Sequence, residues 1–271
     1  MNLEHGAKVL VMGILNVTPD SFSDGGRFIS KNTIAAQVDA MLEAGADIID
    51  VGGESSRPFA EPVSMAAELD RVLPAISLIR QRSAIPVSID TTKAEVARRA
   101  LAEGADIIND ISALRFDQEM LSLVRETDVP VIIMHMKGTP ADMQIAPQYD
   151  DVVAEIKEFF RQRLAWAEVK GISRERFIID PGIGFGKSVD HNLSILKRVS
   201  EFSELSCPVL IGHSRKSFIG KILDAEVDAR DVATAAISAL CAQRKVAILR
   251  VHDVGKTVQA VRITEAINGA S

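Results

Sequence analysis

The sequence predicts a single (β/α)8 TIM barrel, and three observations lead to that fold. Eight short apolar runs recur along the chain, amphipathic segments alternate with them, and the spacing between units is even. Dividing 271 residues among eight strand-helix units gives about 34 residues each, close to the size of a βαβ unit. We expect residues 1–271 to form one barrel domain. An open doubly wound sheet is the alternative, because periodicity alone does not prove closure.

The predicted strands are the eight apolar runs, and nearly every run ends on a polar residue. The runs span residues 9–15, 46–51, 86–89, 106–108, 129–134, 177–179, 208–212 and 246–249. The polar residues are Asn16, Asp50, Asp90, Asn109, His135, Asp180, His213 and Arg250. Buried parallel strands are apolar on both faces, and their carboxyl ends form the active-site face of a barrel. We therefore expect these polar side chains to converge on one site.

The segments between the runs are predicted helices. Apolar residues recur in them at three- to four-residue spacing, which is typical of helices that cover a sheet. They span residues 32–44, 64–82, 93–103, 117–126, 150–170, 190–202, 230–244 and 254–267.

Composition excludes several classes of function. A net charge of −6 and a pI near 5.5 argue against general affinity for nucleic acid or anionic membranes. No apolar run approaches the roughly 18 residues of a membrane span, and residues 1–6 lack the features of a signal peptide. We expect a soluble, cytoplasmic protein that binds neither nucleic acid nor membrane. Cys207 and Cys241 are expected to be buried thiols.

The first two strand-to-helix connections, residues 16–31 and 52–63, are unusually long. Gly25-Gly26 and Gly52-Gly53 give their backbones freedom to close, and loops of this length in a compact barrel are usually functional. Aromatic residues in these polar loops (Phe22, Phe28 and Phe59) favour functional lids over tolerated surface insertions.

The segment DPGIGFGKS, residues 180–188, resembles two nucleotide-binding motifs without matching either. Pro181 occupies a glycine position of the Walker A loop, and the alternating glycines lack the GxGxxG spacing. We expect a carboxylate, Asp180, followed by a turn whose missing side chains let a flat ligand approach the backbone. The alternative is that Asp180 only caps a turn.

Cations gather after the seventh and eighth strands, where barrels frequently bind phosphate. Ser214, Arg215 and Lys216 follow the seventh strand, and Arg250 and His252 end the eighth. Arg offers a bidentate fork to phosphate oxygens. We therefore predict an anion site here. The five histidines form no metal motif, but Asn16 and a pyrophosphate could hold Mg²⁺ between them.

These motifs identify a resemblance that covers nearly the whole chain. The segments MGILNVTPDSFSDGG, DIIDVGGESSRP, SIDT, INDI, MHMKGTP, DPGIGFGK, SRKSFIG and RVHDV, in this order, resemble the dihydropteroate synthase family, on which sulfonamide drugs act. The resemblance implies a homodimeric transferase of folate biosynthesis. It implies that (7,8-dihydropterin-6-yl)methyl diphosphate and p-aminobenzoate react, with Mg²⁺, to give dihydropteroate and pyrophosphate.

The resemblance also implies roles for individual residues. Pterin binding falls to Asp90, Asn109, Ile111, Met134, Asp180, Phe185 and Lys216. Diphosphate binding falls to Asn16, Ser56, Arg57, Arg250 and His252, with Asn16 also the metal ligand. The p-aminobenzoate positions are Phe22, Pro58, Lys216 and Ser217. The catalytic residues are Lys216, Arg250, Asp90 and Asn109.

Residue chemistry agrees with these roles, and three positions depart from the family pattern. A buried carboxylate such as Asp180 accepts the two parallel N–H donors of a pterin edge, which a cation cannot do. Ser56 stands where Thr is common, Phe59 where Gly is common, and Lys137 where Gln is common. Since Phe59 is bulkier and less permissive at positive φ, sulfonamide sensitivity does not follow from the resemblance.

Two other functions compete with the synthase. A pterin-binding barrel that transfers a methyl group from a tetrahydrofolate to a corrinoid protein would share Asp90, Asn109 and Asp180, but it has no need of a pyrophosphate cluster. Arg57, Arg250 and His252 therefore favour the synthase. A non-catalytic pterin-binding paralogue is disfavoured because both loops and all the matched polar positions remain.

Overall fold

The structure is a computed structural model that describes residues 8–18, 31–55, 62–139, 143 and 147–270. The sequence predictions for Phe22, Ser56, Arg57, Pro58 and Phe59 lie outside the described residues. Among the described residues, no helix combines the length and apolar composition needed to span a membrane.

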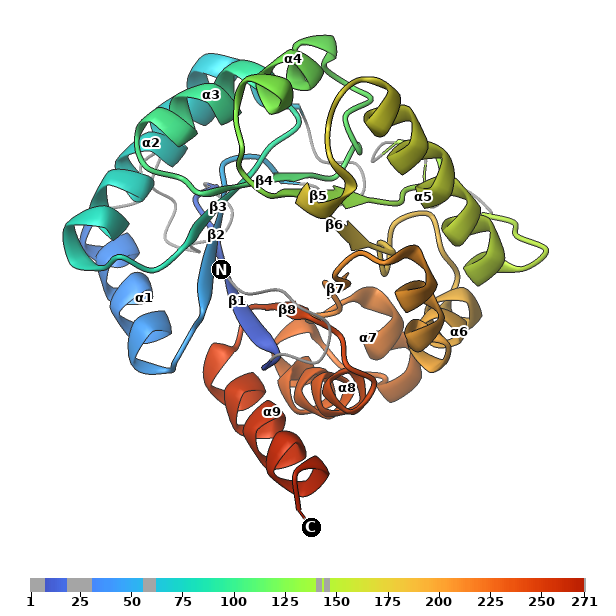
Figure 1. Cartoon of the computed structure of the whole chain (residues 1–271). Coiled ribbons are helices and arrows are strands. Elements are labelled where there is room, and N and C mark those ends of the chain that lie inside the picture. Colours follow the sequence, from blue (N-terminus) through green and yellow to red (C-terminus); the bar gives the residue numbers. More distant parts are fainter. Residues whose placement is uncertain (1–7, 19–30, 56–61, 140–142, 144–146, 271) are drawn as a thin grey trace.

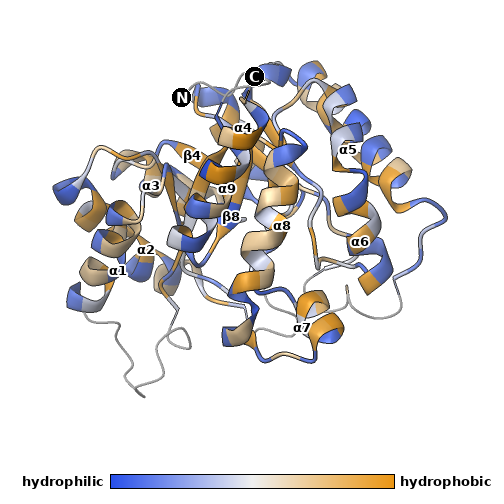
Figure 2. Cartoon of the chain, turned by 90° about the horizontal axis from the view of Figure 1, so that it is seen from below, coloured by the Kyte–Doolittle hydropathy of each residue, from blue (hydrophilic) through white to orange (hydrophobic). Residues whose placement is uncertain are grey.

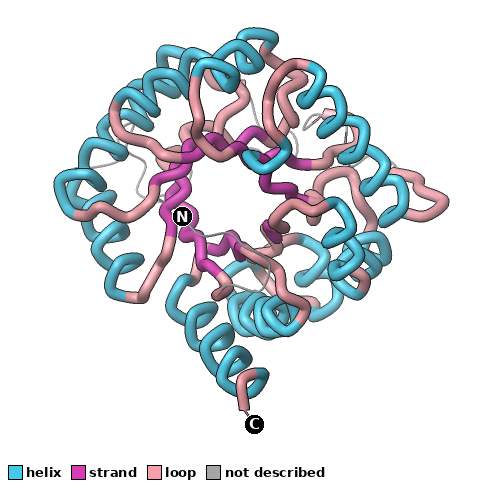
Figure 3. The backbone as a smooth tube through the Cα atoms, viewed as in Figure 1, coloured by secondary structure: helices cyan, strands magenta, loops and turns pink. Residues whose placement is uncertain are grey.

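The described strands form a ring of parallel β-strands with helices around it (Figures 1 and 3). The strands are β1 (Leu10–Asn16), β2 (Ile48–Gly52), β3 (Val87–Asp90), β4 (Ile107–Asp110), β5 (Val131–Met134), β6 (Phe177–Asp180), β7 (Leu210–Ile211) and β8 (Ile248–Val251). Hydrogen-bonded neighbours run in the order β6-β5-β4-β3-β2-β1-β8-β7. A parallel bridge between Ile179 and Val209 joins β6 to the start of β7. The predicted barrel is therefore confirmed, nearly closed at this last junction.

The helices lie between the strands in sequence and on the outside of the ring in space. They are α1 (Lys31–Glu43), α2 (Met65–Arg82), α3 (Ala94–Ala102), α4 (Gln118–Glu126), α5 (Val152–Val169), α6 (Val189–Lys197), α7 (Ser217–Leu223), α8 (Asp231–Gln243) and α9 (Val254–Asn268). Figure 2 shows hydrophobic residues along β4 and β8, and hydrophobic and hydrophilic residues alternating along several of the outer helices.

Two helical details differ from the prediction. The segment predicted as one helix over residues 190–202 is α6 followed by a 3-10 helix, Val199–Leu205. Within the segment treated as an anion-binding loop, Ser217–Leu223 form the short helix α7. Seven residues are too few for the apolar periodicity that identified the longer helices.

A layer of apolar side chains fills the barrel below the mouth. Seven strands contribute one residue each: Met12, Ile48, Ile107, Ile132, Ile178, Leu210 and Ile248. Since side chains alternate between the two faces of a strand, the residue two positions later also faces inward, nearer the carboxyl end. On β2, β4, β5, β6 and β8 those residues are Asp50, Asn109, Met134, Asp180 and Arg250. The strand period thus places the polar residues above an apolar floor.

Candidate active site

Strand register brings four residues of the mouth into one row. Asn16 of β1 pairs with Gly52 of β2, Gly52 pairs with Asp90 of β3, and Asp90 pairs with Asn109 of β4. A Cβ atom at Gly52 would lie 3.5 Å from Asn16 Oδ1 and 3.7 Å from Asp90 Oδ2. The glycine therefore leaves a gap between two polar side chains.

Arg250 is the centre of a partly buried ion-pair network. Its Nε donates to Asp50 Oδ2 and its Nη2 donates to Asp90 Oδ2, each at 2.6 Å. Asn109 Nδ2 lies 3.3 Å from both carboxylate oxygens of Asp50. We call Arg250, Asp50, Asp90 and Asn109 the ion-pair cluster. Sequence analysis marked Asp50 only as a strand-end residue and gave it no role, because its partner is 200 residues away.

Burial and charge act against each other in this cluster. Burial alone lowers the pKa of the Arg250 guanidinium, but the Asp50 and Asp90 carboxylates raise it overall. Burial raises the pKa of the Asp90 carboxyl to about 7, although Arg250 opposes the shift. Arg250 therefore stays charged, whereas burial makes Asp90 easier to protonate than an exposed carboxyl.

Asp180 lies on the same rim as Arg250. A Cβ atom at Gly212 would lie 3.7 Å from Asp180 Oδ2 and 4.0 Å from the Cβ and Cδ atoms of Arg250. Asp180 is buried, and its Oδ1 accepts a hydrogen bond of 2.8 Å from the Gly182 N–H. Burial raises the pKa of the Asp180 carboxyl, while the Gly182 N–H, Lys216, Arg250 and Lys187 lower it. A carboxylate and an arginine thus share one opening.

An apolar wall stands beside Asp180. Met134, Met136, Met143 and Phe185 form a buried cluster against which Ile111 packs. The Lys216 ammonium lies 4.2 Å from the centre of the Phe185 ring. The structure therefore brings together Ile111, Met134, Phe185 and Lys216, which the sequence had assigned to one ligand. We call the five residues of this cluster the apolar wall.

The alternating glycines after Asp180 have a packing role that the sequence did not predict. All three have positive φ, and a Cβ atom at Gly182 would lie 2.0 Å from the His135 carbonyl oxygen. At Gly186 a Cβ atom would lie 2.5 Å from the Lys137 carbonyl oxygen, and at Gly184 it would lie 3.2 Å from Lys216 Cδ. Neighbouring protein atoms occupy the space of these missing side chains, so the glycines let the segments pack closely; approach of a flat ligand to this backbone stays a prediction.

Three polar residues expected at the site belong to other parts of the fold. The His213 ring is fully buried, and its Nε2 lies 3.0 Å from the Thr234 carbonyl oxygen on α8. His135 is buried against Phe159 in an edge-on contact. Arg215 makes two hydrogen bonds to the Asp231 carboxylate. Convergence of every strand-end residue was therefore wrong: residues just past a strand end turn toward the helices.

Two further predicted residues lie just past β8 and at the start of α7. His252 Nδ1 is 2.9 Å from Ser214 Oγ, which also accepts a hydrogen bond from the His252 N–H. Ser214 thus fixes the imidazole, a contact that adjacency in sequence does not reveal. Ser217 is exposed at the first residue of α7.

A divalent cation at this mouth would depend on few protein ligands. Among the described residues, no group of three or more His, Cys, Asp or Glu side chains has metal-site geometry. Asn16 offers one carboxamide oxygen at the rim, partly exposed. One such oxygen suits Mg²⁺, which usually keeps water and takes phosphate oxygens from its substrate.

The two free cysteines, Cys207 and Cys241, are buried, as predicted. Burial raises the pKa of the Cys207 thiol to about 11 and that of the Cys241 thiol to about 12. Neither thiol is poised to react as a thiolate.

Comparison with known proteins identifies the family. The pterin binding enzyme family matches residues 12–252. The chain is 48% identical to dihydropteroate synthase of Escherichia coli strain K12 over 256 residues, which is 94% of this chain and 90% of that protein. Yersinia pestis dihydropteroate synthase, solved in a sulfonamide drug complex, matches with a TM-score of 0.94 and 41% identity, covering 100% of this chain and 97% of that one.

A third relative has been solved with molecules of the reaction itself. Xanthomonas albilineans dihydropteroate synthase with 4-aminobenzoic acid has a TM-score of 0.91 at 45% identity, covering 97% of this chain and 94% of that one. In complex with 7,8-dihydropteroate it has a TM-score of 0.88 at 42% identity, covering 100% and 97%. The chain therefore belongs to the dihydropteroate synthase family of pterin binding enzymes.

Proposed function

We propose that this chain joins (7,8-dihydropterin-6-yl)methyl diphosphate to p-aminobenzoate, giving 7,8-dihydropteroate and pyrophosphate in tetrahydrofolate biosynthesis. One observation carries the proposal: a buried carboxylate, an apolar wall and a paired arginine meet at one barrel mouth, in a chain similar to dihydropteroate synthases over nearly its full length.

The pterin ring occupies the space between Asp180 and the apolar wall. The Asp180 carboxylate accepts the ring N–H and the exocyclic amine, while Asn109 offers both a donor and an acceptor to neighbouring ring nitrogens. Lys216 donates to the ring carbonyl and N5, from a position close to Phe185. Asp90 completes the polar edge. Ligands without the complementary edge are rejected, because the buried polar groups would stay unsatisfied.

Departure of pyrophosphate precedes attack by the amine and leaves a methylene cation stabilised by the pterin. Arg250 and His252, with Asn16, Ser56 and Arg57, stabilise the negative charge that grows on the leaving oxygens. Within the described contacts, Arg250 uses Nε and Nη2 on carboxylates, which leaves Nη1 for an anion. The fixed carboxylates orient the guanidinium before the ligand binds.

The second substrate then supplies the nucleophile. The aniline nitrogen of p-aminobenzoate is already nucleophilic and needs no strong base. Phe22, Pro58, Lys216 and Ser217 surround it in the proposal, and Ser217 lies directly after Lys216 at the start of α7. Lys216 thus lies between the two substrates.

Mg²⁺ belongs to the proposal as the metal cofactor. Asn16 would hold it through the carboxamide oxygen, together with diphosphate oxygens and water. When bound, the ion supplies positive charge against the leaving group.

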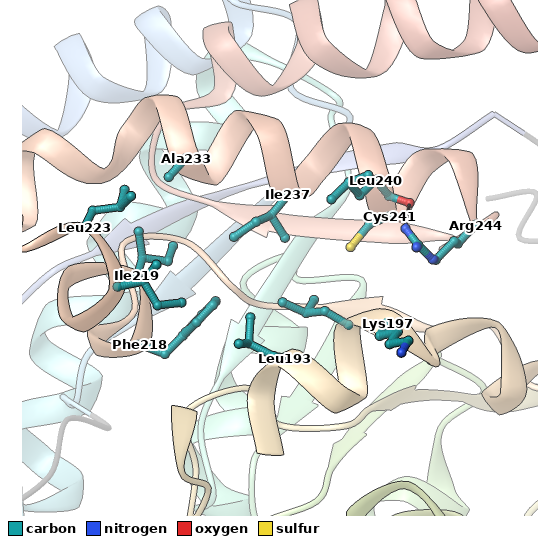
Figure 4. Close-up of a pocket in the computed structure, with 12 residues that line it drawn as sticks. Leu193, Lys197, Phe218, Ile219, Leu223, Ala233, Ile237, Leu240, Cys241 and Arg244 are labelled. Atoms are coloured by element: carbon teal, nitrogen blue, oxygen red, sulfur yellow. Dashed lines mark hydrogen bonds between the residues drawn. The ribbon is translucent and has the colours of Figure 1, made fainter. Parts of the chain in front are cut away.

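A homodimer is the proposed assembly, and an apolar groove supports it. The groove lies between α6, α7 and α8 and has a volume of about 360 Å³. Figure 4 shows Leu193, Phe218, Ile219, Leu223, Ile237 and Leu240 facing it from these helices. Leu193, Leu223 and Leu240 are each more than two-fifths exposed, which is unfavourable unless a second surface covers them. Sedimentation should give twice the chain mass, and Leu240→Glu should give the monomer.

A cytoplasmic location is also proposed, and cell fractionation tests it. The protein should be found in the same fraction as soluble cytoplasmic marker enzymes.

The test of function is product formation. Purified protein with both substrates and Mg²⁺ should release pyrophosphate and dihydropteroate in equal amounts, and omission of p-aminobenzoate should abolish dihydropteroate. Chelation of Mg²⁺ should slow the reaction. Absence of product from folded protein at every Mg²⁺ concentration contradicts the proposal, and tight pterin binding without turnover would then favour a non-catalytic paralogue.

A further inference from the structure

Lys187 is a buried lysine with a full set of acceptors. Its exposed fraction is 4%, and its Nζ lies 2.9 Å from the Phe185 carbonyl oxygen, 3.0 Å from His135 Nδ1 and 3.3 Å from the His135 carbonyl oxygen. An ammonium has three N–H donors, and three acceptors surround this one. Because Nζ donates to His135 Nδ1, the imidazole proton resides on Nε2.

We infer that Lys187 is a positioning residue of the pterin pocket: its ammonium ties the turn after β6 to the end of β5 and holds a positive charge behind Asp180. This inference rests on the proposed function. The sequence analysis gave Lys187 no role, since it appears there only as the end of a glycine-rich motif.

The first part of the inference follows from how the two loops meet. Phe185 belongs to the apolar wall, so its carbonyl oxygen anchors the residue against which the pterin stacks. The His135 N–H donates to the Asp180 carbonyl oxygen at 2.9 Å, and Gly182 has no room for a side chain beside the His135 carbonyl. Lys187 is the one side chain among these contacts that bonds to both loops. It therefore fixes Phe185 relative to Asp180.

The second part concerns charge. Three cations lower the pKa of the Asp180 carboxyl: Lys216, Arg250 and Lys187. Burial lowers the pKa of Lys187 to about 7, with Asp180 opposing that shift and Lys216 adding to it. The nearby His135 is neutral, because burial lowers its pKa to about 2. Removing the Lys187 charge should therefore make Asp180 easier to protonate, and a protonated Asp180 loses one acceptor for the pterin edge.

Calorimetric binding of a pterin that lacks phosphate, measured across pH, tests the inference. Lys187→Met keeps an unbranched side chain as far as Cε and removes the ammonium, with its charge and its three donors. We expect affinity to fall tenfold or more, equivalent to a shift of about one pKa unit or one lost charge-assisted hydrogen bond. We also expect the acid side of the binding profile to move to higher pH, while the KM for p-aminobenzoate stays within twofold of wild type.

Lys137→Met is the matched control. Lys137 lies on the adjacent loop, bonds to the Gln148 carbonyl oxygen and stacks on Tyr149, so its removal also loosens a loop. It is not among the largest causes of the shift in the Asp180 pKa, whereas Lys187 is. A purely structural disturbance lowers stability in both variants but leaves the acid side of the profile in place.

Wild-type affinity and an unmoved acid limb in Lys187→Met would overturn the inference, while product formation by the wild type would keep the proposed function intact. Failure of the wild type to form product would instead contradict the function alone. If Lys187→Met does not fold, Lys187→Arg and Lys187→Gln replace it. The Lys187→Arg variant should keep its pterin affinity to lower pH than the Lys187→Gln variant. Identical pH profiles would show that the charge at this position does not act on Asp180.

Discussion

Strands β2, β3 and β8 hold their polar side chains in direct ion pairs, whereas β5 and β6 hold theirs through backbone contacts and a buried lysine. In the ion-pair cluster, Arg250 contacts two carboxylates at 2.6 Å. On the other side of the mouth, Asp180 accepts a hydrogen bond from a backbone N–H. The positive charges of Lys216, Arg250 and Lys187 oppose the rise in its pKa.

Under the proposed function, this difference matches the two kinds of ligand that the mouth would bind. An anion is bound best by a cation already oriented, and Asp50 and Asp90 orient Arg250 while they stabilise its charge in a buried place. A neutral heterocycle with N–H donors needs a carboxylate whose oxygens are not consumed by side-chain ion pairs. In the proposed function, direct pairing therefore suits the arginine that binds the diphosphate, and longer-range charge suits the Asp180 carboxylate that binds the pterin.

Removal of Arg250 should have the largest effect on activity. Arg250→Ala should lower kcat/KM by about a thousandfold, because it removes stabilisation of the leaving group. Calorimetry should show a much larger loss of affinity for the pterin diphosphate than for a pterin without phosphate. Arg250→Lys, which keeps the charge but not the fork, should recover only part of the loss. Equal losses for both ligands would refute the anion assignment.

On the Asp180 side of the mouth, where backbone contacts hold the loops together, a substitution should instead lower stability by disturbing the packing. Gly182→Ala introduces a Cβ atom 2.0 Å from the His135 carbonyl oxygen at φ +72°, whereas Gly171→Ala at φ +86° meets nothing within 4 Å. Left-handed strain costs roughly 1–2 kcal/mol at either position. We expect Gly182→Ala to lower the free energy of unfolding by at least about 2 kcal/mol more than Gly171→Ala in urea titrations. Equal destabilisation would mean that the two loops are not in contact.

The barrel and most of its mouth could be predicted from sequence because both depend on short-range period. Alternation along a strand fixes that Asp90, Asn109, Asp180 and Arg250 face inward, whatever the neighbouring strands contain. The family resemblance, and not the strand period, identified Ile111, Met134 and Phe185, which lie in one cluster.

What sequence could not provide are the contacts between distant strands. The Asp50–Arg250 pair joins β2 to β8, and the Lys187 cage depends on the three-dimensional path of two loops. Residues beyond the strand period, such as Arg215 and His213, turn toward α8, where Asp231 and Thr234 bind them. Their polar side chains were expected at the functional site, but they form hydrogen bonds between the barrel and α8 instead.

Lys216 tests whether one residue serves both substrates. Lys216→Ala should lower pterin affinity and turnover together, by about a hundredfold, since a charge-assisted hydrogen bond contributes about 1.5–3 kcal/mol. Lys221→Ala, on the exposed face of the same helix α7, is the control and should match wild type. Normal kinetics in Lys216→Ala would show that the ring carbonyl lies elsewhere.

Stability should depend on pH through the Asp90 carboxyl of the ion-pair cluster. Burial raises the pKa of Asp90 from 3.8 to about 7, so between these values the unfolded chain has lost a proton that the folded chain keeps. Stability should therefore fall as pH rises through this window, by no more than about 1.4 kcal/mol per pH unit, and level off above it.

Asp90→Asn removes that slope but adds a constant loss of the Arg250 contact. Urea titrations from pH 4 to 8 measure the free energy of unfolding of both proteins. As pH rises, the stability of wild type should fall relative to that of Asp90→Asn. Asp70 is an exposed carboxyl on α2, so Asp70→Asn should show the same pH dependence as wild type. A difference that does not change with pH would mean that Arg250 keeps Asp90 ionised throughout, and the cluster would then be a fixed charge triad.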